Sequence, residues 1–420
     1  MRVLSTRVRR IAVVLIAGVV ATAGFATTGS AGQANDVGIT AKAIKVGYIF
    51  SGTGIASSTF LNAGKTFKAR IDRQNAHGGV NGRKIDATIV DDESAHNGDV
   101  EKDLVQNKHV FVLVNNSSFA FTSWRFMIEN NVPMVGGGYD GNEYSLPGNE
   151  ILFNAILGNG SPIYGLPYTT LPKLFKKMGA TRIGVFAYGA SPSSSAAGQN
   201  LQKYAVPDAG LKAVYTNTNV DFGTTDVGPL VLGLKNANAD GVYLPMVANT
   251  NIAVLSAAAQ NGLKFKSAVL ATGYGQPLLD QPVAKTLGPE VVLAQGFAPV
   301  ELKTKATKQF MADRKKYAGL TGVPDFGEYM GYITGELLVL GLEHAGNPPT
   351  RKGFVDGLHQ LGSFDWAGMA CQPIDISLTN YGKSPQTQCS WYMQIKNGKF
   401  VAFPKNGKPW RGKLIPIPGQ

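Results

Sequence analysis

Two short loops of this sequence carry hydroxyl and amide side chains in a pattern that suits a bound anion. One is Ser51-Gly52-Thr53-Gly54 and the other is Asn116-Ser117-Ser118, and each follows an apolar segment. Hydroxyl groups and the free backbone N–H groups at a helix start together stabilise a carboxylate. The alternative is a structural role, because Ser caps helices and Gly-rich loops form plain turns. We predict that the hydroxyl groups of both loops bind a ligand, namely Ser51, Thr53, Ser117 and Ser118.

The acidic and nucleophilic residues show no recognisable catalytic or metal-binding pattern. Asp91-Asp92-Glu93 is the densest acidic group, but no His stands at a fixed spacing from it, and we interpret it as a strand end followed by a helix start. The Ser-rich segment 189–198 is not a nucleophile elbow, and the five histidines form no HExxH pattern. We therefore expect no enzyme activity, no metal and no cofactor, with a secreted hydrolase as the alternative.

Cys371 and Cys389 are the only cysteines of the chain. Two cysteines in an exported protein more often pair than stay free. On the chain-entropy model, a disulfide between them would stabilise the C-terminal region by roughly 3 kcal/mol. Two free thiols and a metal site are the alternatives, but the segment between the cysteines contains no His and only one acidic residue, Asp375.

The first 34 residues are typical of a secretory signal peptide. Arginines at positions 2, 7, 9 and 10 precede the apolar run 11–25, and small residues follow around Ala31 and Ala34. The run is short and rich in Gly and Ala, which favours a cleaved signal over an uncleaved membrane anchor. We predict an exported, periplasmic or extracellular protein that is not a lipoprotein, because no Cys lies at the cleavage site.

Length and charge limit the classes of protein that this chain can belong to. Removal of residues 1–34 takes away four Arg and lowers the formal net charge from +12 to +8. The basic residues are scattered and form no dense run with aromatic residues between them, so we expect no nucleic-acid binding. The remaining chain of about 385 residues exceeds a single ordinary core, which predicts two domains.

Apolar strands alternate with helix-like segments along the mature chain. We predict a helix over residues 60–75 and strands over 44–50, 84–90, 110–114, 133–135, 182–187, 241–244 and 268–271. Repeated strand–loop–helix units predict parallel sheets with helices on both faces.

A weak internal repeat indicates two similar halves. Segments 110–114 and 132–135 of the first half correspond to 241–244 and 268–270 of the second, and polar or Gly-Tyr elements follow each strand. Ligands of open α/β sheets bind beyond the carboxyl ends of strands. We therefore add residues of these loops to the predicted site, namely Gly138 for its backbone N–H group and Tyr139, Asp140, Asn249, Thr272 and Tyr274 for their polar or aromatic side chains.

The order and spacing of these segments resemble the leucine/isoleucine/valine-binding proteins, which are type I periplasmic solute-binding proteins of ABC transporters. The resemblance covers nearly all of the mature chain and rests on residues 44–52, 78–84, 90–92, 239–243 and 260–263. It implies an α/β fold of two Rossmann-like lobes with parallel sheets, joined by three crossover hinge segments. It also implies that lobe 1 contains residues 43–157 and 294–365, and that lobe 2 contains 158–293 and 366–420.

The family's binding positions match this sequence only in part. The Ser that holds the ligand carboxylate in the family matches Ser117 or Ser118, while Asp140 stands where the family has Thr. Thr272 stands where the family has an acidic residue that binds the ligand's ammonium group. The resemblance thus implies the class of protein but a different ligand, and we expect an acid or amide without a free α-ammonium group.

The aromatic residues of the family pocket are also replaced. The first-lobe aromatic matches Ser57, and the second-lobe aromatics match Val247 or Ala248, so Ser57 joins the predicted ligand-binding residues. Tyr139 and Tyr274 are the candidate aromatic replacements. We predict a monomeric solute-binding protein of an ABC importer of the branched-chain amino acid family, which closes on a small ligand and delivers it to a membrane permease. A ligand-sensing receptor component is a further alternative.

Overall fold

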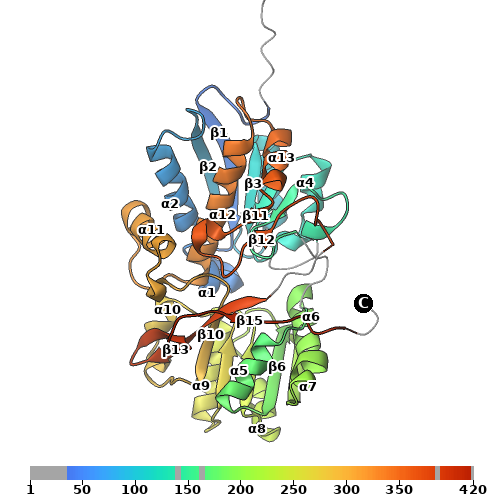
Figure 1. The fold of residues 1–420 in the computed structure, drawn as a ribbon, viewed down its shortest axis with the longest axis vertical. Coiled ribbons are helices and arrows are strands. Elements are labelled where there is room, and N and C mark those ends of the chain that lie inside the picture. The colour runs from blue at the N-terminus through green and yellow to red at the C-terminus, as the bar shows by residue number, and fades with distance from the viewer. Residues whose placement is uncertain (1–35, 138–142, 160–165, 384–387, 418–420) are drawn as a thin grey trace, which may run out of the picture. The chain divides into compact units, whose positions relative to one another are not determined.

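The computed structural model describes residues 36–137, 143–159, 166–383 and 388–417. The fold consists of two α/β lobes, each built on one main sheet (Figure 1). The first sheet has the strand order β2-β1-β3-β4-β5 and all its strand pairs are parallel. Its strands are β1 (Ala43–Phe50), β2 (Lys84–Asp91), β3 (Val112–Asn116), β4 (Met134–Gly136) and β5 (Leu152–Asn154).

The second sheet repeats this order and adds an antiparallel edge. Its order is β14-β13-β10-β9-β8-β6-β7, with β15 paired to β13. The pairs from β7 to β10 are parallel, whereas β13 runs antiparallel to β10, β14 and β15. The strands are β6 (Arg182–Tyr188), β7 (Lys212–Val220), β8 (Gly241–Leu244), β9 (Ser267–Leu270), β10 (Val291–Gln295), β13 (Cys389–Lys396), β14 (Lys399–Phe403) and β15 (Trp410–Arg411).

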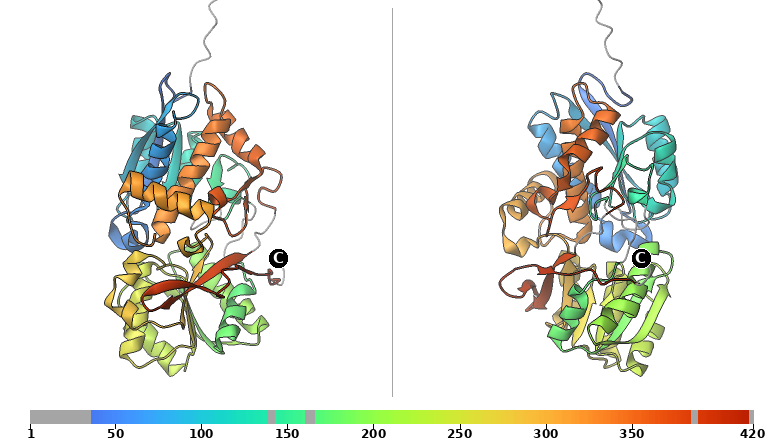
Figure 2. Two further views of the ribbon diagram at one scale, coloured as in Figure 1. Left: turned by 60° about the vertical axis from the view of Figure 1, so that its left-hand side comes forward. Right: turned by 45° about the vertical axis from the view of Figure 1, so that its right-hand side comes forward.

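Helices cover the faces of both sheets, as expected for parallel strands joined by crossovers. In lobe 1 the long helix α12 packs on α2 and β3, and Figure 2 shows the dark red C-terminal strands joining the second sheet. The helices are α1 (Ser57–Phe60), α2 (Ala63–Ala76), α3 (Asn97–Lys102), α4 (Arg125–Glu129), α5 (Thr170–Met178), α6 (Pro192–Asn200), α7 (Val206–Asp208), α8 (Gly228–Asn236), α9 (Ala248–Gln260), α10 (Gln276–Leu279), α11 (Lys305–Asp313), α12 (Phe326–His344) and α13 (Arg351–Leu361).

The predicted α/β fold of two lobes with parallel sheets is confirmed, with two differences. The predicted helix 60–75 is divided, because α1 ends at Phe60 and the carbonyl of Asn62 accepts the first hydrogen bonds of α2 from Lys65 and Thr66. The second sheet is not purely parallel, because β13, β14 and β15 add antiparallel strands to it.

The chain passes between the two sheets three times, after β5, after β10 and before β13. A small sheet of β11 (Ser363–Phe364) and β12 (Ile374–Asp375) precedes the third passage. The lobe boundaries drawn from the sequence stay a prediction. In the described part of the chain, no helix has the length and apolar character needed to cross a membrane.

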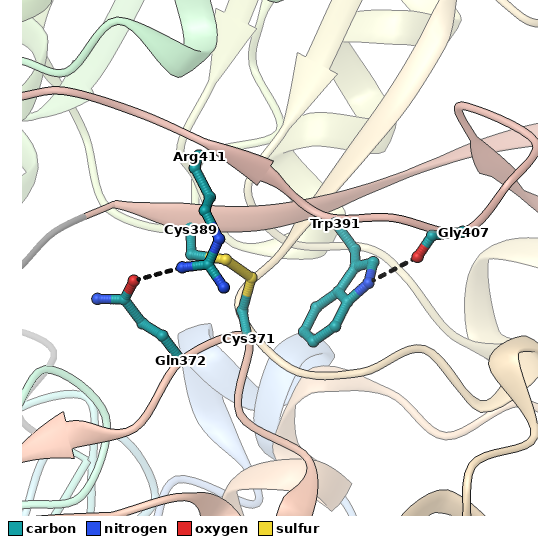
Figure 3. The surroundings of a disulfide bond; sticks show 6 residues. All are labelled: Cys371, Gln372, Cys389, Trp391, Gly407 and Arg411. Carbon is teal, nitrogen blue, oxygen red and sulfur yellow. Dashed lines mark hydrogen bonds between the residues drawn. A yellow bond between two sulfur atoms is a disulfide. The ribbon is translucent and has the colours of Figure 1, made fainter.

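A disulfide joins Cys371 and Cys389, as predicted, with 5.7 Å between their Cα atoms (Figure 3). Cys389 begins β13, and the backbone N–H of Cys371 donates to the carbonyl of Gly296, 3.1 Å away. Gly296 follows β10, where the second passage of the chain between the sheets begins. The disulfide therefore ties the segment between β11 and β12, next to the start of the second passage, to the first residue of β13.

Replacement of both cysteines by Ser should lower the free energy of unfolding by roughly 3 kcal/mol, because the unfolded chain regains the entropy of the open loop. Urea unfolding of the oxidised wild type and of Cys371→Ser/Cys389→Ser measures the difference. Wild type in a reducing agent is the matched control and should lose the same amount. Equal stability of oxidised wild type and the double variant would contradict the prediction.

Candidate functional site

Both main sheets bring polar loops to the point where their strand order reverses. In lobe 1 this point lies between β1 and β3, which are followed by Ser51 and by Ser117-Ser118. In lobe 2 it lies between β6 and β8, which are followed by the segments 189–191 and 245–247. Ligands of open α/β sheets bind at such a switch point, outside the carboxyl ends of the strands. The fold therefore predicts that a ligand binds next to these four loops.

A cavity of about 310 Å³ is lined by residues of both lobes, and we call it the serine cavity. Its polar lining consists of hydroxyl groups, namely Thr59, Ser118, Tyr188, Ser191, Ser193, Ser194 and Thr272. Its apolar lining includes the aromatic rings of Phe60, Phe222 and Phe326. Among the described residues that line it, none is charged. Such a lining can donate hydrogen bonds to an acid or amide and cover an apolar body.

Ser118 has the hydroxyl group best placed to bind a ligand in the serine cavity. The side chain is 6% exposed, and its Oγ has no hydrogen-bond partner among the residues that the structure describes. Its backbone N–H donates to Ser51 Oγ, 3.1 Å away, so Ser51 positions the loop rather than lining the cavity. A buried polar group without a partner costs about 1–3 kcal/mol. A ligand that accepts a hydrogen bond from Ser118 removes that cost.

Ser117 and Thr53 lie outside the lining of the serine cavity. Ser117 Oγ donates to the carboxylate of Asp92 and accepts from Phe119 N at 2.9 Å. Burial raises the pKa of Asp92, and the hydrogen bond from Ser117 opposes that rise. The N–H groups of Gly52 and Thr53 both donate to Asp91 Oδ1, at 2.9 and 3.2 Å. The Gly-rich loop therefore binds an anion, but that anion is the protein's own carboxylate.

In lobe 2, two hydroxyl groups of the serine cavity are held by the loop after β8. Thr272 Oγ1 donates to the carbonyl of Met246 and accepts from Asn251 Nδ2 at 3.2 Å. The hydroxyl of Tyr188 accepts from Val247 N at 2.9 Å. Burial raises the pKa of Tyr188, and its hydrogen bonds oppose that rise. Thr272 stands where the family has an acidic residue, and the groups that contact its hydroxyl here are a carbonyl and an amide, which are both neutral.

A second cavity of about 400 Å³ shares Thr59 and Phe326 with the first, and we call it the Asp325 cavity. Three residues predicted from the sequence line it, namely Ser57, Asn249 and Tyr274. The hydroxyl of Tyr274 donates to Glu301 Oε2 at 2.7 Å and Tyr274 is 1% exposed. Its hydroxyl is therefore already bound within the protein.

Hydroxyl groups of α1 cap the start of α9 across the two lobes. Ala248 N donates to Thr59 Oγ1 at 3.2 Å, and Asn249 N donates to Ser58 Oγ at 3.3 Å. Ser58 Oγ in turn donates to Asn249 Oδ1 at 3.1 Å. These N–H groups have no partner within their own helix. The contact is thus a polar link between the lobes, beside residues of both cavities.

Gly275 allows a second close approach of the lobes next to the Asp325 cavity. Its φ of +140° is a conformation that favours glycine, and a Cβ at this position would lie 2.7 Å from the Cα of Asp325. The neighbouring Gln276 N donates to the carbonyl of Val323 at 2.8 Å. The predicted residues Gly138, Tyr139 and Asp140 lie outside the described residues, so their places relative to both cavities stay predictions.

Several residues of the two cavities were not found from the sequence. Ser191 caps α6 by accepting from Ser194 N at 3.1 Å, which agrees with the structural reading of this Ser-rich segment, and both residues also line the serine cavity. Asp325 caps α12 by accepting from Glu328 N at 2.9 Å. The Asp-x-x-Glu spacing signals this helix start. Nothing in the spacing signals that Asp325 and Phe326 face a cavity.

A buried carboxyl group supports the loop that carries Ser118. Glu101 Oε1 accepts hydrogen bonds from Asn97 Nδ2 at 3.2 Å and from Asn115 Nδ2 at 2.9 Å. The Oδ1 atom of Asn115 then accepts from Ser117 N at 2.9 Å. Burial raises the pKa of Glu101 to about 7, and its hydrogen bonds oppose the rise. The chain of contacts runs from Glu101 through Asn115 to the residue before Ser118.

The raised pKa of Glu101 predicts a stability that depends on pH. The folded state binds a proton here that the unfolded state has released, so stability should fall as pH rises from about 4.5 to about 7. Glu101→Gln keeps an acceptor and should remove this fall, which is on the order of 3 kcal/mol. Urea unfolding at pH 5 and pH 8 compares the variants. Exposed Glu129→Gln is the control and should keep the wild-type fall; the same fall in Glu101→Gln would refute the assignment.

Comparisons with known proteins place the chain in a family. A model of the periplasmic binding protein family matches residues 43–399. A comparison with curated protein sequences found no match. Among solved structures, the fold is similar to a branched-chain amino acid-binding protein from Streptococcus pneumoniae in complex with isoleucine, with a TM-score of 0.71, 17% identity, and coverage of 88% of this chain and 100% of that one.

Two further solved structures have the same fold. A fatty acid ABC transporter substrate-binding protein from Thermomonospora curvata has a TM-score of 0.71 and 19% identity, covering 90% of this chain and 93% of that one. A solute-binding protein from R. palustris in complex with 4-hydroxybenzoate has a TM-score of 0.68 and 18% identity, covering 89% and 98%. These likenesses confirm the resemblance drawn from the sequence, and with the family match they show that the chain belongs to the periplasmic binding protein family and has the type I fold.

Proposed function

We propose that this protein is an exported solute-binding component of an ABC importer of the branched-chain amino acid type. It binds a small acid or amide in the serine cavity and delivers it to the membrane permease. The observation that carries the proposal is the serine cavity, which is lined by residues of both lobes. One of these residues is Ser118, whose hydroxyl group has no hydrogen-bond partner among the described residues. Ser118 lies at the lobe 1 switch point, and ligands of open α/β sheets generally bind at such a point, which supports the proposal.

The lining of the serine cavity supports a ligand without an ammonium group. Burying an ammonium ion without a partner costs several kcal/mol. Thr272 is neutral and its hydroxyl is already engaged by Met246 and Asn251. The solved structures with this fold include complexes with 4-hydroxybenzoate and benzoate as well as with isoleucine. Asp140 is the residue that would supply a negative charge if an amino acid were the ligand.

The mechanism is binding and closure without bond chemistry. A ligand that contacts both lobes stabilises the arrangement in which the lobes are closest, and the three chain passages between the sheets serve as hinges. Hydrogen bonds such as that from Ala248 N to Thr59 Oγ1 already link the lobes beside the cavities. The permease would recognise the closed form. The protein acts as a monomer, needs no nucleic acid or cofactor, and releases its ligand unchanged.

A calorimetric titration of the purified mature protein tests the proposal. Benzoate, 4-hydroxybenzoate, their amides and leucine are titrated into wild type and Ser118→Ala. We expect binding of an acid or amide that weakens about 10- to 100-fold in Ser118→Ala, because a hydrogen bond to a charged group is lost. Ser363→Ala, at an exposed position of β11, should bind as wild type does. Ligand recovered chemically altered would instead indicate an enzyme.

Leucine binding would show that the ligand class is wrong while the transport role stands. Micromolar affinity for leucine that disappears in Asp140→Asn would place the missing negative charge at Asp140. Failure of Ser118→Ala to weaken any bound ligand would place the site outside the serine cavity.

A further inference from the structure

We propose that the ligand is an elongated amphipathic molecule that occupies both cavities. This inference rests on the proposed function. The acid or amide head lies against Ser118 in the serine cavity. The apolar body passes Phe326 and ends in the Asp325 cavity. The Asp325 cavity is therefore a second subsite that receives an aliphatic or aromatic tail.

The lining of the Asp325 cavity suits an apolar tail. Most of its residues are apolar, and they come from both lobes, with Leu61 from lobe 1 and Ile252, Pro277 and Leu278 from lobe 2. Burying a methylene group in such a lining improves binding by the hydrophobic effect. Asp325 is the only residue with an acidic or basic side chain among the described residues that line this cavity.

The two cavities are neighbours, because Thr59 and Phe326 line both of them. Volumes of about 310 and 400 Å³ place each cavity near the lower limit of about 300 Å³ for small-molecule sites. A ligand that uses both therefore gains apolar contact area that neither cavity provides alone.

The charges fix the direction of the ligand. A carboxylate head next to Asp325 would face another carboxyl group, whereas the described lining of the serine cavity carries hydroxyl groups and no charge. Asp325 caps α12, and the hydrogen bond from Glu328 N keeps its Oδ1 engaged as an acceptor. Asp325 thus offers little to an anionic head, and the tail is the end that suits this cavity.

Exposed leucines near both cavities agree with an apolar ligand. Leu61 lines the Asp325 cavity and is 58% exposed, and Leu157 lines the serine cavity and is 43% exposed. An exposed leucine alone is ordinary on a protein surface. Here each of the two extends the apolar lining of a cavity, so a tail in contact with them would remove apolar surface from water.

A chain-length series tests the inference. Unbranched carboxylates from butanoate to dodecanoate, and their amides, are titrated calorimetrically into the mature protein below their micelle concentrations. Affinity should rise about fourfold per methylene over the whole length that fills both cavities. Ala253→Phe fills the Asp325 cavity from α9, so in this variant the rise should stop at a shorter chain, while butanoate and benzoate bind as before. Ala259→Phe, exposed on the same helix, is the matched control and should keep the wild-type series.

The outcomes separate this inference from the proposed function. If short acids bind and depend on Ser118, but affinity stops rising at the same chain length in wild type and Ala253→Phe, the second subsite is refuted and the solute-binding role stands. If neither acids nor amides of any length bind, the ligand class and the subsite both fall. Ile252→Gln adds no bulk and provides a second variant, which should reduce the gain per methylene for the longer chains if Ala253→Phe does not fold.

Discussion

Replacing Arg314 with Met should lower the free energy of unfolding by about 3–5 kcal/mol, because it leaves a buried carboxylate without its partner. The side chains of Arg314 and Glu328 are 1% and 5% exposed and form an ion pair. Arg314 Nη1 also donates to the carbonyl of Gly322 at 3.2 Å. Burial raises the pKa of Glu328, and Arg314 opposes that rise. Urea unfolding at pH 8 measures the loss.

The pH dependence identifies the cause of this loss. Without Arg314 the folded-state pKa of Glu328 should lie further above its unfolded value, so the variant should lose stability as pH rises above about 4.5. The deficit relative to wild type should therefore be smaller at pH 5 than at pH 8. Adding Glu328→Gln should recover much of the stability at pH 8, because no buried charge then remains unpaired.

A surface pair provides the matched control. Lys68 and Asp72 are 2.6 Å apart, with side chains 60% and 30% exposed. Lys68→Met should change stability by less than about 1 kcal/mol, because water already solvates both charges. A loss in Arg314→Met as small as that of Lys68→Met would contradict the prediction.

The ion pair also bears on the ligand site. Glu328 lies in the first turn of α12, where its N–H group donates to the cap residue Asp325, and Phe326 is the first residue of that helix. Phe326 lines both cavities. Arg314 therefore holds in place the helix end that forms the boundary between them. The double variant Arg314→Met/Glu328→Gln would show whether ligand binding needs the charges or only a folded helix start.

Several buried parallel strands could be predicted from the sequence because their apolar runs are continuous, although the short β5 and the apolar β10 were missed. The predicted segments 44–50, 84–90 and 241–244 match β1, β2 and β8 to within one residue. β7 was missed because its short apolar run continues into the polar residues Thr-Asn-Thr-Asn, and because most of this edge strand is only half-buried. Periodicity alone gives a weak signal for such a strand.

The antiparallel edge of the second sheet has a sequence signal that lies outside the repeated strand–loop–helix units. Asn397 and Gly398 have φ of +50° and +68° and connect β13 to β14 as a two-residue hairpin turn. Asn-Gly between apolar segments is a strong hairpin signal. The two halves of the chain resemble each other only up to β10, so a pattern based on the repeat stops before this hairpin.

The candidate site was predictable where residues follow strands and not where they belong to distant helices. Ser118 and Thr272 follow β3 and β9, and both line the serine cavity. They could be predicted because ligands of open α/β sheets bind beyond the carboxyl ends of strands. The same argument predicted Ser117 as a ligand-binding residue. Successive side chains along this segment point to opposite sides, however, and the hydroxyl of Ser117 donates to Asp92. Asp325 and Phe326 reach the cavities from the start of α12. Only the packing of α12 on the first lobe determines that position.

The second large effect concerns Ser118, whose replacement by Asp should reduce the affinity for carboxylate ligands by more than about 100-fold. A negative side chain would then face the ligand's carboxylate in a cavity whose described lining has no positive charge, and such a like-charge contact costs several kcal/mol. The amide of the same acid should lose much less, since it is neutral and can donate to the new carboxylate. Calorimetric titration with an acid and its amide measures both.

Ser118→Asn separates charge from size in this experiment. Asn is neutral and similar in size to Asp, and its amide can donate to a carboxylate, so the acid should bind Ser118→Asn far better than Ser118→Asp. The preference of the protein for acid over amide should therefore invert in Ser118→Asp and persist in Ser118→Asn. Equal losses for acid and amide in Ser118→Asp would mean that the carboxylate head does not lie beside Ser118. Because the backbone N–H of Ser118 donates to Ser51 in every variant, the loop itself should keep its place.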